Sequence, residues 1–229
     1  MVPAEPGWQR ARAAVAAQTG RDVLAPLQKD FSAKEVQLIR AAYAIIGEKG
    51  VHSFSLQDVA EAAWVSKGVI LYHFKSKENL ILATMRWVLS TVAERIHRSL
   101  ARARSPQDRV LAMIDTIFAD PDANRNFYTA YLDLVGDAAR LDAYNKLSAT
   151  FHDIVNVLYA DVIRQGVDDG AFTVTDLEES ARVLRAIIDG LFVQWVADTG
   201  WQTSHARYRD TCKRAALAYL RSPNAGAKV

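Results

Sequence analysis

One stretch of the chain, Ser55–Lys77 (SLQDVAEAAWVSKGVILYHFKSK), restricts the fold more than any other part of the sequence. Ser55 is a typical helix N-cap residue, and Asp58 stands three residues later, where an acidic side chain completes a capping box. Apolar residues then recur at the i, i+3, i+4 and i+7 positions of one helix face. They are Leu56, Val59, Ala60 and Ala63. The pattern predicts a short amphipathic helix that begins at Ser55.

A second short helix follows almost at once. Trp64 and Val65 form a tight turn, and Ser66 is an N-cap candidate for a helix over Lys67–Phe74. Ser76 is a third N-cap candidate, and a long helical pattern starts after it. Two short helices joined by a tight turn are typical of the helix-turn-helix, whose second helix enters the major groove of DNA.

The composition of the second helix fits contact with DNA. Residues 66–77 include three lysines, one histidine and no acidic residue. Val65, Ile70 and Phe74 have the spacing to anchor the helix, and Gly68 lets the backbone approach a phosphate closely. The side chains left for other faces are those of Lys67, Val69, Tyr72 and His73. The alternative is an ordinary helical hairpin with a solvated lysine face.

The segment from about Ser32 to Leu82 resembles the N-terminal domain of the TetR family of transcriptional regulators. The resemblance rests on AAYAIIGEKGVHSFSLQDVAEAA, VSKG, HF and KSKENL at this spacing. It implies a three-helix DNA-binding domain with phosphate contacts from Ser55, His73 and Lys77. It also implies base or phosphate contacts from Ser66, Lys67, Val69 and Tyr72.

Two positions depart from the family pattern. Trp64 stands where a glycine is usual, in a turn that favours positive φ, which is costly for a bulky residue. We expect Trp64 either to impose a different turn or to pack over the preceding helix. Leu71 stands where the family usually has a tyrosine, so it cannot donate that hydroxyl to a phosphate, although the adjacent Tyr72 could.

The rest of the chain has the composition of a globular, all-α protein. Apolar residues make up 50% and charged residues 24%, and strand-like alternation is scarce. No apolar run is long enough to span a membrane, and the first residues do not resemble a secretory signal. The single cysteine, Cys212, cannot form an internal disulfide. We therefore expect a cytoplasmic protein. The net charge of +2 does not identify a partner.

We predict three regions. Residues 1–30 form an N-terminal extension, residues 31–76 the helix-turn-helix DNA-binding domain, and residues 77–229 a domain for ligand binding and dimerisation. Within the extension, Trp8–Ala17 favours a few helical turns. The arginines of the extension (Arg10, Arg12 and Arg21) would make it a basic arm that reaches DNA. Alternatively, the extension is disordered or packs on the neighbouring domain.

The second region begins with a helix over Ser32–Glu48, capped by Ser32 and Glu35. The third region continues with six helices, which brings the total to nine. They are expected at about 77–102, 106–119, 122–138, 140–166, 176–198 and 204–221, with a turn at Gly166–Gly170. This half is similar, more loosely, to the betaine-regulator-like branch of the family through RQGVDDGAF and DLEESARVLRAIIDGLFVQWVAD.

The helix near 176–198 is apolar almost all the way round from Ala186 (AIIDGLFVQWVA), so it must be covered on every side. The helix near 204–221 carries a partner stripe of Tyr208, Thr211, Cys212, Ala215, Tyr219 and Leu220. We expect a C2 homodimer in which these two helices of each subunit form a four-helix bundle. The alternative is a helix buried in its own core.

The family resemblance also implies a small-molecule pocket among the middle helices. The aromatic candidates for its lining are Trp87, Phe118, Phe127, Tyr128, Tyr131, Phe151, Tyr159, Phe192 and Trp195, although such residues usually fill a core. The polar candidates are Asp115, Asp133, His152, Asp189 and Gln194. Asp189 lies in the most apolar run of the chain, where a carboxylate needs a partner across the dimer, a local backbone group or a cationic ligand.

The sequence lacks the patterns of an enzyme. The five histidines (52, 73, 97, 152 and 205) have no metal-ligand spacing, and phosphate-binding glycine loops are absent, so we expect no metal, no cofactor and no catalytic residue. The prediction is a repressor that binds a pseudo-palindromic operator as a dimer and is released by a small-molecule effector. The alternatives are an all-α ligand-binding or catalytic dimer with a degenerate helix-turn-helix, and a non-specific architectural DNA binder.

Overall fold

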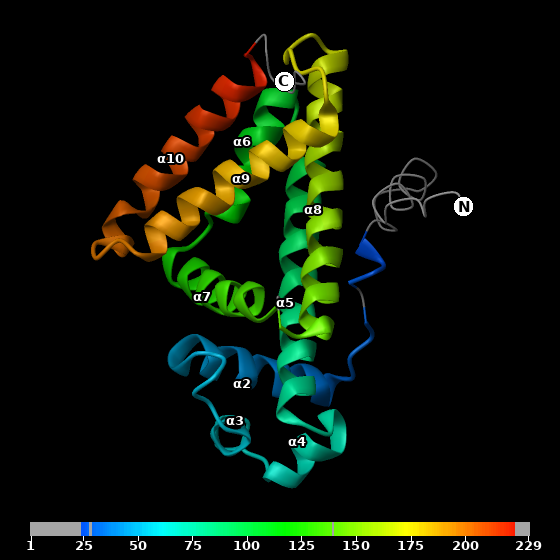
Figure 1. Ribbon diagram of the computed structural model, residues 1–229, viewed down its shortest axis with the longest axis vertical. Coiled ribbons are helices and arrows are strands. Elements are labelled where there is room, and N and C mark those ends of the chain that lie inside the picture. Colours follow the sequence, from blue (N-terminus) through cyan, green and yellow to red (C-terminus); the bar gives the residue numbers. More distant parts are fainter. Residues whose placement is uncertain (1–23, 28, 139, 223–229) are drawn as a thin grey trace. The chain divides into compact units, whose positions relative to one another are not determined.

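The computed structural model describes residues 24–27, 29–138 and 140–222. These residues form nine α-helices and no strand (Figure 1), which confirms the predicted all-α fold. The helices are α2 (Ala33–Lys49), α3 (Leu56–Ala62), α4 (Lys67–Phe74), α5 (Lys77–Leu100), α6 (Pro106–Ile117), α7 (Pro121–Ala138), α8 (Asp142–Asp168), α9 (Leu177–Val196) and α10 (Trp201–Leu220). The helix predicted at Trp8–Ala17 and the arginine arm lie outside the described residues.

The helices divide into two compact units. The N-terminal unit comprises Pro26–Thr91 and Asp122–Phe151, and the described part of the C-terminal unit includes residues 92–121 and 152–222. Helices α5 and α8 each contribute residues to both units. The predicted boundary after residue 76 separates the region for DNA binding from the region for ligand binding and dimerisation. This division by function stays a prediction.

Most helix ends follow the local signals in the sequence. Ser32 and Glu35 form the predicted capping box, Ser105 caps α6 ahead of Pro106, and the Asp176 side chain accepts two backbone N–H groups of α9. The turn expected at Gly166–Gly170 starts later than predicted, because α8 continues to Asp168 and includes Gly166.

A close contact explains why this helical position is a glycine. A Cβ on Gly166 would lie 1.9 Å from Cδ2 of the buried Phe172, so the missing side chain makes room for the ring. The chain reverses instead at Gly170, whose φ is +67°. Helix α10 also begins earlier than predicted, at Trp201.

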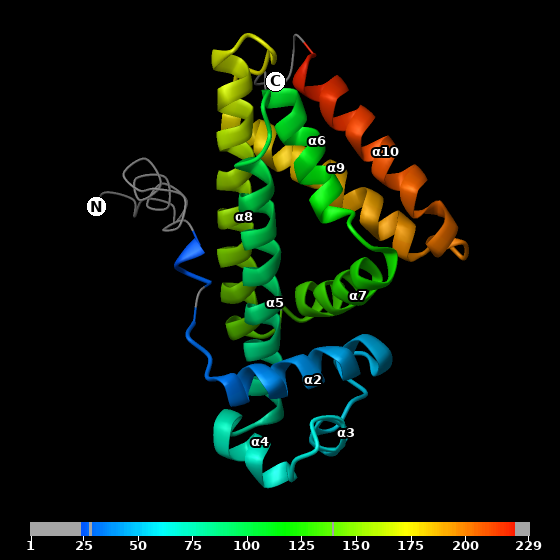
Figure 2. The same cartoon turned by 180° about the vertical axis from the view of Figure 1, so that it is seen from behind.

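The C-terminal unit is built around α9, which packs against α10, as α10 does against α6 (Figure 2). The rings of Phe118 and Phe192 are stacked with centroids 4.0 Å apart. Trp195 lies edge-on to His205, 5.0 Å away, and its Nε1–H donates to the carbonyl of Trp201 at 2.6 Å. Phe118 and Trp195 are at most 1% exposed, so both belong to the core of this unit.

The imidazole of His152, on α8, is half-buried in the same unit. Burial lowers its pKa to about 4, and the nearby Arg185 guanidinium adds repulsion to the charged form. An unfolded chain titrates this group near its ordinary value of about 6.5. Between these values the unfolded state binds more protons than the folded state, so stability is lost as the pH falls.

We predict a measurable share of acid sensitivity from His152. The free energy of unfolding should fall from pH 6.5 to pH 5 by less than about 1.4 kcal/mol per pH unit for this group, because partial exposure screens the effect. Urea denaturation of His152→Gln at fixed protein concentration should show a shallower pH slope. Asp58→Asn is the control, since burial plays little part in the pKa of about 2 at Asp58, and that group titrates below this window. Equal slopes for wild type and His152→Gln would contradict the prediction.

Candidate nucleic-acid interface and effector region

The helices α2, α3 and α4 share one small core in the N-terminal unit. Helix α2 contributes four buried residues: Leu38, Ile39, Ala42 and Ile46. Phe54, from the loop before α3, is 2% exposed and is also part of the buried core. Helix α4 adds Ile70 and Phe74, which are 0% and 6% exposed. The predicted anchors Ile70 and Phe74 are therefore confirmed, and they fix which face of α4 points outward.

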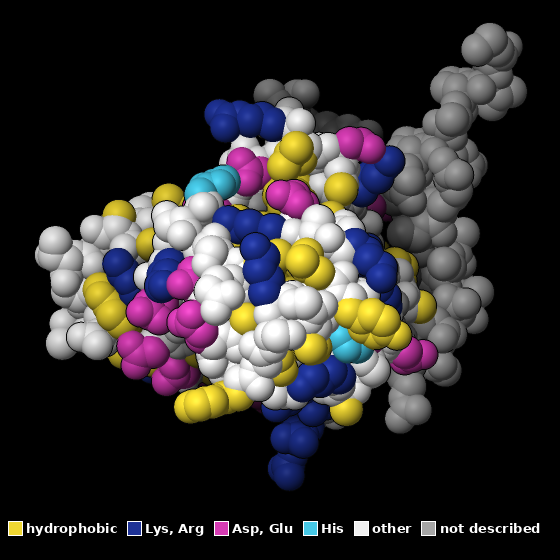
Figure 3. All heavy atoms as spheres, turned by 90° about the horizontal axis from the view of Figure 1, so that it is seen from below, with side chains coloured by type: hydrophobic (Ala, Val, Ile, Leu, Met, Phe, Trp, Pro, Cys, Tyr) yellow, Lys and Arg dark blue, Asp and Glu magenta, His cyan; other side chains and the backbone are white. Residues whose placement is uncertain are grey.

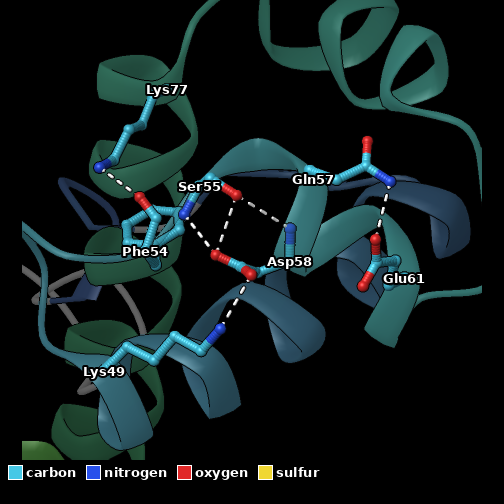
Figure 4. A network of polar contacts seen from close by, with 7 residues as sticks. All are labelled: Lys49, Phe54, Ser55, Gln57, Asp58, Glu61 and Lys77. Atoms are coloured by element: carbon cyan, nitrogen blue, oxygen red, sulfur yellow. Dashed lines mark hydrogen bonds and ion pairs between the residues drawn. The ribbon is translucent and has the colours of Figure 1, made fainter.

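The start of α3 is held by a polar network (Figure 4). The Ser55 backbone N–H donates to Asp58 Oδ2 at 2.7 Å, and the Asp58 N–H donates to Ser55 Oγ at 3.2 Å, which is the predicted capping box. Lys49 adds an ion pair to Asp58 Oδ1 at 2.8 Å. This ammonium and the Ser55 bonds hold the pKa of Asp58 at about 2. The Ser55 hydroxyl also donates to Asp58, so it serves the cap in addition to any phosphate contact.

The turn between α3 and α4 keeps the positive φ that suits glycine. Trp64 has a φ of 54°; its N–H donates to the Glu61 carbonyl at 3.1 Å, and the Val65 N–H donates to Ala60 at 2.9 Å. These two bonds define a Schellman motif with Trp64 at its left-handed position. The Trp64 side chain is 94% exposed. Both expectations for this residue were wrong, because the turn is not replaced and the ring does not pack over α3.

The outward face of α4 begins at its first turn. Ser66, Lys67 and Gly68 are exposed, Val69 is half-buried, and Tyr72 is 74% exposed. Ser66 stands at the N-cap position but its side chain makes no cap hydrogen bond, contrary to expectation. Figure 3 shows the face that carries α3 and α4: Lys and Arg side chains are spread across it, and the largest group of Asp and Glu side chains lies toward its left edge.

Two lysines near the end of α4 make hydrogen bonds within the N-terminal unit. Lys75 Nζ donates to the Tyr72 carbonyl at 2.8 Å and lies 5.3 Å from that ring's centroid. Lys77 Nζ donates to the carbonyls of Phe54 and His52 at 2.5 and 3.3 Å. For the predicted phosphate contact, the Lys77 ammonium must either bind a phosphate in addition to these carbonyls or give up one of them. His73 is half-buried and edge-on to Tyr72.

Helix α7 holds the loop between α2 and α3 through two long-range polar contacts that no sequence pattern predicted. Asp133 Oδ2 accepts the Val51 N–H at 3.3 Å, and His52 Nε2 lies 3.6 Å from Asp137 Oδ2. Asp133 was a candidate for the effector pocket, and the structure uses it to hold this loop. The two partners are 82 residues apart, so no local pattern could have paired them.

The aromatic candidates fall into separate groups. Phe127, Tyr128, Tyr131 and Phe151 form one cluster in the N-terminal unit, with the ring centroids of Phe127 and Tyr131 stacked 5.7 Å apart. Trp87, in the same unit, lies beneath the Arg40 guanidinium at 5.7 Å. Phe118, Phe192 and Trp195 belong to the core of the C-terminal unit, with Tyr159 also buried there.

The polar candidates of the C-terminal unit have varied surroundings. Asp189 Oδ2 pairs with Arg185 Nε at 3.1 Å along α9, and the two side chains are 35% and 11% exposed. Asp115 Oδ1, on α6, pairs with Lys213 Nζ of α10 at 2.5 Å. Gln194 is exposed. Asp189, whose carboxylate lies in the most apolar run of the sequence, thus has an ion-pair partner on its own helix.

The described residues contain no group of three or more His, Cys, Asp or Glu side chains that could hold a metal ion. None of the described helices is both long and apolar enough to cross a membrane.

Comparisons with known proteins agree with this geometry. Residues 38–84 match the bacterial regulatory proteins of the tetR family, and residues 106–221, more than half of the chain, match the C-terminal domain of BetI-type transcriptional repressors. The HTH-type transcriptional regulator BetI of Rhizobium meliloti is 26% identical over 160 residues, which cover 69% of this chain and 75% of the relative.

Solved structures share the fold. A TetR transcription regulator from Haloarcula marismortui has a TM-score of 0.72 at 24% identity, over 83% of this chain and 97% of that one. A putative transcriptional regulator from Saccharomonospora viridis in complex with choline has a TM-score of 0.73 at 23% identity, over 79% and 93%. The match over residues 106–221 establishes the family. The chain belongs to the tetR family of bacterial regulatory proteins, has a BetI-type C-terminal domain, and is a DNA-binding transcriptional regulator rather than an enzyme.

Proposed function

We propose that this regulator is a cytoplasmic repressor that binds a pseudo-palindromic operator as a homodimer and leaves it when a small molecule binds. The observation that carries the proposal is the first turn of α4. Ile70 and Phe74 hold the helix from one side, and Ser66, Lys67 and Gly68 are exposed on the other. A helix-turn-helix reads base edges with the N-terminal residues of its second helix.

The proposed roles divide between reading and positioning. Lys67, Val69 and Tyr72 would contact base edges, with Ser66 contacting a base or a phosphate. The exposed backbone at Gly68 would approach a phosphate, because no side chain stands in the way. Ser55, His73 and Lys77 would position the domain through phosphate contacts, which carry no sequence information.

Dimerisation is proposed through α9 and α10. Helix α9 buries Ile188, Phe192 and Trp195 within its own unit but leaves Val193 48% exposed. Four residues of the α10 stripe are partly exposed, whereas Cys212 and Leu220 are fully buried in the single chain. Side chains left partly exposed on two adjacent helices suit contact with a second copy related by twofold symmetry.

The effector is proposed to bind the helical region that follows Lys77. The candidate residues are Trp87, Phe118, Phe127, Tyr128, Tyr131, Phe151, His152, Asp189 and Trp195. A cationic effector such as the choline bound by the Saccharomonospora viridis protein would have to compete with Arg185 for Asp189.

Coupling between effector and DNA is proposed to run through α5 and α7. Lys77, the first residue of α5, binds two carbonyls of the loop before α3, and Asp133 of α7 binds the backbone of Val51. A ligand releases DNA only if it favours the conformation in which these helices place α4 wrongly. A tightly bound effector that leaves DNA affinity unchanged would contradict this coupling.

The first test is selection of bound duplexes from a random pool at near-physiological salt. We expect an enriched inverted repeat whose half-sites lie about one turn of DNA apart, because two recognition helices enter successive major grooves. Enrichment of no sequence, from protein that is folded and retained on DNA, would favour the architectural alternative. No binding at all would favour a ligand-binding protein with a degenerate helix-turn-helix.

The second test is Lys67→Ala, which should weaken operator binding by about 1–3 kcal/mol if Lys67 contacts a base edge. Titrations on the operator and on unrelated duplexes separate two cases. A loss confined to the operator indicates base contact, whereas a uniform loss with a salt slope reduced by about 1 indicates a phosphate contact. Lys146→Ala is the matched control, since it removes the same charge from an exposed position on α8. Unchanged operator affinity for Lys67→Ala would exclude this residue from the interface.

The third test is Val193→Arg, which should convert a dimer to a monomer in sedimentation analysis, because the new charge would be buried without a partner. Val135→Arg is the matched control, since Val135 is 38% exposed on α7, outside the proposed interface. Circular dichroism would show that both variants are folded. A dimer that survives Val193→Arg as well as it survives Val135→Arg would place the interface elsewhere.

A further inference from the structure

Trp64 combines two features that folding alone does not explain. Its indole is 94% exposed, the largest exposure among the large hydrophobic side chains of the described residues. Its φ of 54° places a bulky residue in the left-handed region, which costs free energy. A glycine would avoid both the strain and the exposed apolar ring.

The turn itself does not need the indole. Its two defining hydrogen bonds, from the N–H groups of Trp64 and Val65, are made by the backbone. The adjoining helices are anchored by other residues, namely Val59 and Ala60 of α3 and Ile70 of α4, all at most 1% exposed. The side chain of Trp64 therefore adds nothing to the core that the structure displays.

We propose that Trp64 is a DNA-contacting residue that lies against the sugar-phosphate backbone beside the α4 binding site. The inference rests on the proposed function, in which the first turn of α4 enters the major groove. Trp64 precedes Ser66 and Lys67 by two and three residues, and all three are exposed, so the indole is available to a partner that binds at the start of α4.

The chemistry of an indole fits that part of DNA. Its flat apolar face matches a deoxyribose, and its single N–H matches a phosphate oxygen, which is the commonest acceptor at protein–DNA interfaces. The contact would be independent of base sequence and would carry no charge. It would therefore raise affinity for all duplexes without adding to the salt dependence.

Two variants test the proposal on the full-length protein. Trp64→Gly preserves the left-handed turn, and Trp64→Phe keeps an aromatic ring but removes the N–H donor. We expect Trp64→Gly to bind the selected operator and an unrelated duplex about tenfold more weakly, with an unchanged salt slope, because a hydrogen bond to a charged group is lost. Trp64→Phe should show a smaller loss. The urea midpoint of Trp64→Gly should be equal to or above that of wild type, since strain is relieved.

Fluorescence gives a readout that does not depend on affinity. The protein has five tryptophans, so the difference between wild type and Trp64→Phe isolates the emission of Trp64. Iodide should quench this emission in free protein and lose access to it when a short operator duplex is added. Full iodide access in the complex would overturn the proposal, even if Trp64→Gly folded poorly.

The outcomes separate this inference from the proposed function. Wild-type binding to an enriched operator, together with equal affinity of Trp64→Gly, would overturn the role of Trp64 and leave the repressor proposal intact. Failure of wild type to bind DNA would overturn both. Loss of dimer in Trp64→Gly, seen by sedimentation without DNA, would assign Trp64 to contact with a second copy and would also overturn the inference.

Discussion

The N-terminal unit depends on α4 being held from one side only. A helix of eight residues does not persist in water without tertiary contacts, so its orientation comes from its packing against α3 and from the burial of Ile70 and Phe74. In the first turn only Ile70 is fully buried, and Lys67 and Gly68 remain exposed to solvent. The same packing that stabilises the helix thus presents Lys67 and its neighbours, and the reading surface exists only while that small core is intact.

The loop from Val51 to Phe54 is where several elements meet within this unit. Its backbone N–H at Val51 is held by Asp133 of α7, and its carbonyls at His52 and Phe54 are held by Lys77 of α5. Phe54 also contributes the central core side chain and lies 4.3 Å from the Lys77 ammonium. Movement of either helix must carry this loop or break its hydrogen bonds. Such discrete alternatives are what a ligand needs in order to shift an equilibrium.

Local signals predicted most of the fold, and long-range contacts account for what they missed. N-caps at Ser32, Ser55 and Asp176 and the proline after Ser105 act within one helical turn, so the sequence displays them directly. The expected turn at Gly166 was wrong because this glycine makes room for the ring of Phe172, six residues later, and the chain reverses at Gly170. The candidate effector residues are spread over both units, since aromatic residues fill cores as readily as they line pockets. Their role cannot be assigned from composition.

Asp189 and Trp64 show how a structure separates unusual residues of two kinds. Asp189 looked anomalous within an apolar run, but Arg185 lies one turn away on the same helix and supplies its partner. Trp64 looked as though it would be accommodated by a new turn or by packing, but it keeps the strained turn and packs on nothing that the structure displays. Positions that break a local rule without structural compensation are where function is expected. By that criterion Asp189 is explained by the fold, and Trp64 requires a partner outside the chain.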